Sequence, residues 1–186
     1  TVDEQYSSNK VAIVYAVGAI DGGNEEDMES DKIAETLLEL ADDDAIKAVV
    51  LRVNSPGGSA YGSEQIWHAA SLVKAKKPLI VSMGDYAASG GYYISCVADT
   101  IVAQPTTITG SIGIFGLLPN FKGLTEKIGV AFDGVKTNNF ADFGMVMRPV
   151  TTAERVLFQN YVTRGYELFV KRCADGRKKT TDQIKA

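Results

Sequence analysis

The sequence predicts an α/β protein with a largely parallel sheet and surrounding helices, and two observations lead to this prediction. Apolar, strand-like runs alternate with amphipathic helical segments, which is the pattern of βαβ units joined by right-handed crossovers. The chain has 186 residues and is 45% apolar, and a chain of this length buries on the order of 70% of its unfolded surface. These figures favour one globular domain and exclude disorder as the main state.

The first two predicted elements are a strand and a helix. The run Lys10–Ala19 is apolar at successive positions, so both of its faces are expected to be buried in a central strand. Ser30 is expected to cap the helix that follows, because apolar residues recur after it at helical spacing. These apolar residues are Ile33, Leu37, Leu40 and Ala41.

The later elements continue the alternation. Further strands are predicted at Ile46–Val53, Pro78–Met83, Thr100–Ala103 and Val130–Val135. Helices are predicted at Ser63–Lys74, Ser89–Ala98 and Phe121–Ile128. A capping box of Thr151 and Glu154 begins a long helix, which runs to about Ala174 and ends at Gly176. A second capping box begins at Thr180 and opens a further helix.

Composition excludes several classes of protein. The chain has 19 Lys and Arg against 23 Asp and Glu, a formal net charge of −4, and it lacks the basic stripe of a nucleic-acid-binding surface. Its two cysteines are too few for a disulfide scaffold, and their spacing forms no metal knuckle. A single histidine argues against most zinc sites and against Ser-His-Asp catalysis.

No targeting or membrane-spanning segment is recognised in the sequence. The longest purely apolar run, Val11–Val17, is far shorter than the ~20 residues that a spanning helix needs. Residues 1–9 are polar and are expected to form a tail or linker before the folded part at 10–186. The chain has no initiator Met, and its last helix is cut short after Thr180. It is therefore expected to be a piece of a longer polypeptide, truncated at its C-terminus.

The clearest candidate for chemistry is Ser89, in the run Ala87–Gly91. This serine follows an apolar strand and a predicted tight turn at Gly84–Ala88, and it opens a predicted helix. Small neighbours let the backbone turn sharply, as in a nucleophile elbow, and leave the hydroxyl at the positive end of the helix dipole. The other interpretation is a small-residue helix start packed under the sheet.

A second candidate is the pair Gly57 and Gly58, in the loop that follows the second strand. Adjacent glycines let backbone N–H groups approach a substrate closely, which suits an oxyanion hole. An ordinary turn would explain the same two residues. A phosphate-binding loop is excluded, because Ser63 stands where that loop needs a lysine.

A serine nucleophile needs a base, and the sequence offers two kinds. His68 precedes Ser89, whereas the histidine follows the serine in elbow-type hydrolases. A histidine on the surface or in the core of a helix is therefore the better interpretation of His68. The remaining kind of base is a lysine that burial keeps neutral, since desolvation lowers the pKa of its amine.

Three segments resemble one known family. They are Val49–Gly58, Ser82–Ser95 and Thr109–Gly116, and they stand in that family's order. They are similar to the signal peptide peptidase A (protease IV) family, peptidase family S49, of the Clp-protease/crotonase superfamily. The likeness extends from about Lys10 to Ile184. It implies a Clp-protease/crotonase-like α/β fold with repeated β-β-α type units, and a bacterial serine peptidase with a Ser-Lys dyad.

The resemblance implies roles for five residues. Ser89 would be the nucleophile. Gly90, together with Gly57 or Gly58, would supply the N–H groups of the oxyanion hole. Ser111 matches the family's serine that orients the lysine amine. Neither a metal nor an organic cofactor is implied.

The chain departs from the family at the general base. Single-half relatives carry their lysine after the strand predicted at Val130–Val135, in a pattern like Lys-Ser-Gly-x-x-Lys-Asp, and this chain has Ala141 there. Lys136 is the nearest lysine, but it lies five residues too early. The long form of the family has two related halves, with the lysine in the N-terminal half and the serine in the C-terminal half. The chain is therefore expected to be the C-terminal half, and to be inactive or nearly so by itself.

The resemblance also implies substrates, partners and a location. The substrates would be cleaved signal peptides and other apolar peptides, at the periplasmic face of the bacterial inner membrane. The partners would be the lysine-bearing N-terminal half and further copies in a homotetramer, with no nucleic acid. Oxidation of Cys96 and Cys173 is conceivable there, although Cys96 is expected to be a small core residue.

Two further functions remain as alternatives. The first is a crotonase-like enzyme that binds an acyl-CoA thioester with the same backbone amides. The second is a non-catalytic domain whose role is assembly.

Overall fold

The computed structural model of the chain describes residues 9–186, and these divide into two compact units. Within the described residues, unit 1 comprises 9–113 and Leu168–Ala186, and unit 2 comprises Ile114–Glu167. The tail expected at residues 1–9 lies outside the described residues, apart from Asn9. No described helix is both long enough and apolar enough to cross a membrane.

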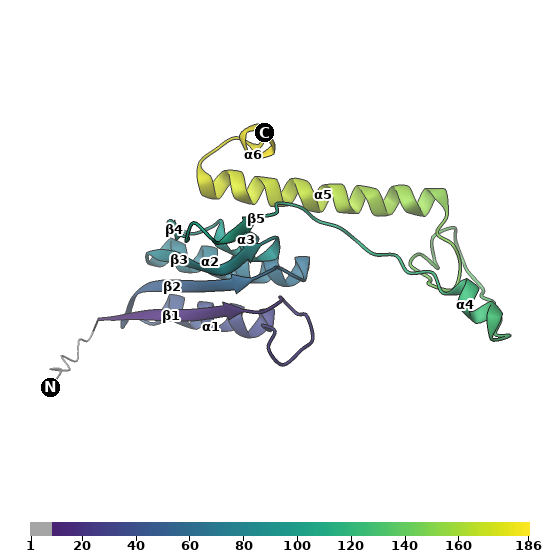
Figure 1. Ribbon diagram of the computed structural model, residues 1–186, viewed down its shortest axis with the longest axis horizontal. Coiled ribbons are helices and arrows are strands. Elements are labelled where there is room, and N and C mark those ends of the chain that lie inside the picture. The colour runs from purple at the N-terminus through teal and green to yellow at the C-terminus, as the bar shows by residue number, and fades with distance from the viewer. Residues whose placement is uncertain (1–8) are drawn as a thin grey trace. The chain divides into compact units, whose positions relative to one another are not determined.

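Unit 1 is built on a five-stranded sheet of order β1-β2-β3-β4, in which β5 also pairs with β3 (Figure 1). Its strands are β1 (Lys10–Val17), β2 (Ile46–Ser55), β3 (Leu79–Ala88), β4 (Thr100–Val102) and β5 (Ile108–Gly110). Its helices are α1 (Ser30–Asp42), α2 (Ala60–Lys76), α3 (Gly90–Ser95), the end of α5 (Thr152–Arg177) and α6 (Thr181–Lys185). The strand pairs are all parallel, which confirms the predicted α/β fold with a largely parallel sheet.

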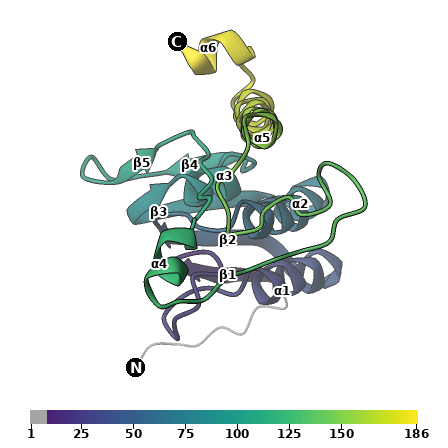
Figure 2. The same ribbon diagram turned by 90° about the vertical axis from the view of Figure 1, so that its right-hand side faces the viewer.

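The core of unit 1 lies between the sheet and helices α1 and α2. In β2, every second residue from Val49 to Ser55 is buried, as expected for a strand with one face against a helical layer. The buried residues of α2 recur at helical spacing, and they include Ile66, Ala69 and Val73. Figure 2 shows α1 and α2 on the same side of the sheet.

The prediction that the first strand is central is wrong. β1 pairs with β2 alone and lies at the edge of the sheet. Val11, Ile13 and Tyr15 on its outer face are 61%, 57% and 65% exposed. The error arises because apolar residues on both faces are typical of a central strand, whereas one apolar face of β1 is open to solvent.

Two further predictions fail in the middle of the chain. The segment Gly84–Ala88 continues β3 instead of turning, because Ala87 pairs with Ser55 on one side and with Thr109 of β5 on the other. No strand forms at residues 130–135. The strand β5 was not predicted, since its three residues are too few to show a period.

The helix ends are set by contacts that lie far away in the sequence. Ser30 is the first residue of α1 and not its cap, because the N–H and hydroxyl of Ser30 donate to the Asp21 carboxylate at 2.8 and 2.9 Å. Helix α5 continues through Gly176, where a Cβ would lie 1.8 Å from the carbonyl oxygen of Cys96. Glycine at this position therefore permits close packing and does not end the helix. The capping box at Thr180 is confirmed.

Unit 2 contains little regular structure. It holds α4 (Lys122–Lys127) and the first part of α5, and the helix predicted at Phe121–Ile128 is thus confirmed. The capping box that begins α5 is also confirmed, with reciprocal bonds between Thr151 and Glu154 at 2.8 and 3.2 Å. Glu154 is the one buried residue of this unit.

Candidate active site

Ser89 lies where β3 meets α3, as an elbow requires. Its φ of 52° and ψ of −120° form a conformation that residues with a side chain rarely adopt. Its N–H donates to the carbonyl of Gly110 at 3.0 Å, and its carbonyl accepts from the N–H of Tyr93 at 2.9 Å. Hydrogen bonds on both sides hold the strained turn and leave the half-buried Ser89 side chain at the start of α3.

Gly57 lies directly against this junction. Its φ is +102°, and a Cβ at this position would be 2.6 Å from the amide nitrogen of Gly90 and 2.8 Å from Cβ of Ser89. Only glycine fits such a close approach. The N–H of Gly57 donates to Oγ of Ser55 at 3.2 Å.

Two other amides at this junction are free to bind. Among the described residues, no hydrogen bond uses the N–H of Gly58 or of Gly90. The Gly90 amide is the first of α3 and has no partner within the helix. Free amides beside a serine at a helix start are the geometry that an oxyanion hole requires, and the assignment of these residues to that role stays a prediction.

Strand β5 brings Ser111 to the same place. Gly110 pairs with Ala88, so Ser111 and Ser89 each follow a paired residue on neighbouring strands. Ser111 is exposed and also has a positive φ, of 50°. Ser111 therefore lies close to Ser89, and its role in orienting a lysine stays a prediction.

The described part of the chain contains no buried lysine. The least exposed lysines, Lys74 and Lys77, donate to backbone carbonyls at 2.8 and 2.7 Å. His68 is exposed on α2, which confirms the helix-surface interpretation. A Ser-Lys dyad needs a lysine whose amine is kept neutral by burial. None of the described lysines is buried in this way.

The segment in which the resemblance predicts the base of single-half relatives lies in unit 2. Ala141 is exposed there. Lys136 is also exposed, and its Nζ lies 3.4 Å from a carboxylate oxygen of Asp142. The hydrogen bond from Arg148, together with the charges of Arg148 and Lys136, holds the pKa of Asp142 below its usual range. Lys136 lacks the burial that makes a lysine a base, so it is a poor substitute.

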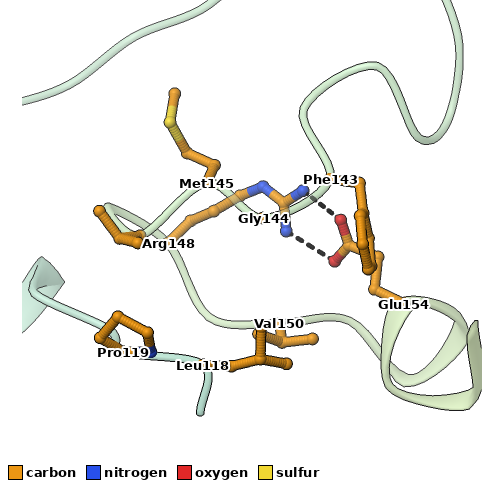
Figure 3. Close-up of a pocket in the computed structure, with 9 residues that line it drawn as sticks. Leu118, Pro119, Phe143, Gly144, Met145, Arg148, Val150 and Glu154 are labelled. Atoms are coloured by element: carbon orange, nitrogen blue, oxygen red, sulfur yellow. Dashed lines mark hydrogen bonds and ion pairs between the residues drawn. The ribbon is translucent and has the colours of Figure 1, made fainter. Parts of the chain in front are cut away.

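Figure 3 shows a pocket of unit 2 in which Arg148 and Glu154 face each other. The guanidinium of Arg148 donates to both carboxylate oxygens of Glu154 at 2.5 and 2.8 Å. The Arg148 bonds and the Thr151 N–H lower the pKa of Glu154 to about 2. None of the predicted site residues lines this pocket, so we interpret the pair as an anchor for the start of α5.

Both cysteines are buried free thiols. A hydrogen bond with Cys173, followed by burial, raises the pKa of Cys96. Cys96 is 1% exposed and belongs to the core, as predicted.

Sequence reasoning missed Ile20, whose backbone is hydrogen-bonded to the loop that contains Gly57 and Gly58 (the glycine loop). The Ile20 N–H donates to the carbonyl of Gly57, and its carbonyl accepts from the N–H of Ser59, both at 2.9 Å. The side chain of Ile20 is fully buried, and a Cβ on Gly90 would come within 3.0 Å of its Cδ1. Ile20 lies beyond the end of β1 and shows no local signal of this role.

Comparison with known families and proteins finds proteases. A model of peptidase family S49 matches residues 71–186, and a Clp protease model matches residues 7–108. A Haemophilus influenzae protein named protease 4 is 45% identical over 179 residues, which cover 95% of this chain and 29% of that protein. A putative signal peptide peptidase SppA from Enterococcus faecium is 34% identical over 194 residues, which cover 100% of this chain and 56% of that protein.

The fold has a counterpart among solved structures. ClpP1 from Listeria monocytogenes superposes with a TM-score of 0.54 at 16% identity, over 92% of this chain and 75% of that chain. This likeness confirms the predicted Clp-protease-like fold and concerns the fold alone. The chain spans less than a third of the length of protease 4 from Haemophilus influenzae or Salmonella typhi.

Proposed function

Because the chain belongs to peptidase family S49, we propose that it is the serine-bearing half of a Ser-Lys serine peptidase. One observation carries the proposal. Ser89 is held in a strained turn at the start of α3, next to the unpaired amides of Gly58 and Gly90. Strain of this kind concentrates at functional sites, where the surrounding structure maintains it.

The proposed reaction begins with attack by Oγ of Ser89 on the carbonyl carbon of a peptide bond, while a lysine amine takes the hydroxyl proton. The carbonyl oxygen becomes an oxyanion, which the N–H groups of Gly90 and Gly58 stabilise. Collapse breaks the C–N bond, and the leaving amine takes the proton from the lysine. Water then releases the acyl group from Ser89 by the same steps. Gly57 would serve in place of Gly58 only by giving up its bond to Ser55.

We infer that the lysine comes from an N-terminal half that this chain does not contain. The described lysines are exposed or half-buried, and Lys136 is paired with Asp142. The methyl side chain of Ala141 cannot accept a proton. Ser111 lies close to Ser89, and we propose that its hydroxyl orients the incoming amine by a hydrogen bond.

The proposed substrates are cleaved signal peptides and other apolar peptides, at the periplasmic face of the bacterial inner membrane. The name of the Enterococcus faecium relative, signal peptide peptidase, supports this substrate class. We also propose that the full protein is a homotetramer. The crotonase-like alternative uses the same amides, but binding of an acyl-CoA thioester gives no reason for strain at Ser89.

The experiment compares two proteins with a fluorogenic apolar peptide. One is this chain alone, and the other is the whole polypeptide that contains it together with the proposed lysine-bearing half. We expect turnover by the whole polypeptide, a loss of at least about a thousandfold with Ser89→Ala, and no turnover by the chain alone.

Three outcomes would contradict the proposal. Turnover of the whole polypeptide that is unchanged by Ser89→Ala would remove Ser89 from the mechanism. Turnover by the chain alone that disappears with Ser89→Ala would place the base inside this chain. Tight binding of coenzyme A without peptide cleavage would favour the crotonase-like alternative.

A further inference from the structure

We propose that Glu64 and Tyr93 are positioning residues for the oxyanion hole, because their hydrogen bond holds the helix that follows Gly57 and Gly58 against the helix that begins at Gly90. This inference deepens the proposed function and rests on it. It adds residues that touch neither the substrate nor Ser89 Oγ, and it identifies what sets the distance between the two sources of N–H groups.

The two sources of the oxyanion hole lie on different elements. Gly57 and Gly58 precede α2, which Ser59 caps by accepting the N–H of Gly62 at 3.0 Å. Gly90 begins α3. The relative placement of these amides therefore depends on how α2 and α3 pack, and a displacement of about 1 Å at a catalytic group costs on the order of a hundredfold in rate.

Glu64 connects both helices to α5. The hydroxyl of Tyr93 on α3 donates to one carboxylate oxygen of Glu64 on α2. Nη2 of Arg172 on α5 donates to the other oxygen at 2.5 Å. The two carboxylate oxygens are thus bound by two different helices, and charge-assisted hydrogen bonds of this kind are stronger than neutral ones.

Aromatic contacts hold the partners of Glu64 in place. The guanidinium carbon of Arg172 lies 3.6 Å from the ring centroid of Trp67, which is also on α2. The ring of Tyr93 packs on Phe169 of α5, with 4.7 Å between centroids. Burial, followed by the bond to Glu64, raises the pKa of Tyr93. Its hydroxyl consequently keeps its proton and remains the donor.

The network acts on the site through short connections. The N–H of Tyr93 donates to the carbonyl of Ser89 at 2.9 Å, so Tyr93 closes the first turn of α3. Ser63 adjoins Glu64, and its Oγ lies 2.5 Å from where a Cβ of Gly90 would be. A shift at Glu64 or Tyr93 is therefore passed to both Ser89 and Gly90.

The neighbouring tyrosine provides a matched control. Tyr92 is on the same helix and equally buried, at 7% exposure, as is Tyr93. Burial raises the pKa of Tyr92 against the charge of Arg177 on α5, and no hydrogen bond joins the Tyr92 hydroxyl to α2 in the described part of the chain. Tyr92→Phe and Tyr93→Phe remove the same atom from the same helix, so only the second variant breaks the connection between α2 and α3.

The test measures binding of a peptidyl boronic acid with an apolar side chain to this chain, followed by ¹¹B NMR. Oγ of Ser89 forms a bond to boron, its proton passes to the buffer, and boron becomes tetrahedral and negatively charged, as the oxyanion would be. We expect Tyr93→Phe to weaken binding by roughly ten- to a hundredfold. Glu64→Gln, which keeps an acceptor for Tyr93, should weaken it less, and Tyr92→Phe should change it less than twofold.

The amide resonance of Gly90 in the free chain gives a second measurement that needs no ligand. We expect this ¹H–¹⁵N resonance to move in Tyr93→Phe and to stay in place in Tyr92→Phe. Equal effects of the two tyrosine variants, on binding or on this resonance, would overturn the inference, as would an unchanged Tyr93→Phe.

Failure of the proposed function has a different signature. If Ser89→Ala binds the boronic acid as well as the unsubstituted chain, the role of Ser89 is contradicted. If the unsubstituted chain binds none, attack by Ser89 requires the proposed lysine of the other half, and binding is measured again with the whole polypeptide. The Gly90 resonance still decides whether Glu64 and Tyr93 position that amide. If Ser89→Ala abolishes binding and Tyr93→Phe does not alter it, the inference alone is overturned.

Discussion

Unit 1 and unit 2 are stabilised in different ways. In unit 1, the sheet and helices bury a continuous apolar core, with Leu51, Ile66 and Val81 at 0% exposure. In unit 2, the one buried residue is the carboxylate of Glu154, held by Arg148. Many large apolar side chains of unit 2 are exposed, among them Phe115, Leu117, Leu124, Ile128, Phe132 and Val135. Independent stability needs a buried apolar core, so unit 1 has the means to fold by itself and unit 2 does not.

The same difference separates the parts of the proposed active site. The proposed site residues Ser89, Gly58, Gly90 and Ser111 all belong to unit 1. Ala141, at the position that the resemblance predicts for the base, belongs to unit 2. Groups that need fixed geometry are thus carried by the unit with the core. The exposed apolar side chains of unit 2 would be covered if, as proposed, another half and further copies complete the protein.

The largest effect should come from a cavity in the core of unit 1. Leu51→Ala removes a fully buried side chain from β2 and should lower the free energy of unfolding by about 2–5 kcal/mol. Val135→Ala, at a fully exposed position of unit 2, should change it by less than about 0.5 kcal/mol. Urea unfolding followed by the fluorescence of Trp67, the single tryptophan of the chain, reports on unit 1. Similar losses in both variants would contradict the contrast between the units.

Glycine substitutions should show the contrast a second time, with a smaller effect. Gly57→Ala places a Cβ 2.6 Å from the amide nitrogen of Gly90 at a positive φ, and should cost about 1–3 kcal/mol. Gly134→Ala in unit 2 meets nothing within 4 Å and should be nearly neutral. The same urea titration measures both. A neutral Gly57→Ala would mean that the close approach of Gly57 to Gly90 is not maintained in solution.

Sequence reasoning succeeded where the signal is local. The buried strand Ile46–Val53 and the capping boxes at Thr151 and Thr180 are visible in a few adjacent residues, and the structure contains each of them. The small residues around Ser89 drew attention to that position for the same reason.

The failures depend on contacts between distant residues. The place of β1 at the edge and the existence of β5 follow from strand pairing, which no short window records. Ile20 braces the glycine loop, and Glu64 meets Tyr93 and Arg172, only because the fold brings three helices and a loop together. Ile20, Glu64 and Arg172 stand in no recognisable motif, and Tyr93 lies in the segment Ser82–Ser95 without a local sign of its contact with Glu64.

The smallest effect should be a local one, at the start of α5 in unit 2. The pKa of Glu154 is lowered from 4.5 to about 2, so the carboxylate stabilises the folded state above pH 4.5 and this contribution is lost as the pH falls towards 2. Hydrogen-exchange protection factors at the first turn of α5 should therefore decrease several-fold over this range. In Glu154→Gln the protection should be low throughout and independent of pH, whereas Glu126→Gln, at an exposed carboxylate on α4, should behave like the unsubstituted chain. A pH dependence that persists in Glu154→Gln would mean that another group anchors α5, and that unit 2 does not rely on its one buried carboxylate.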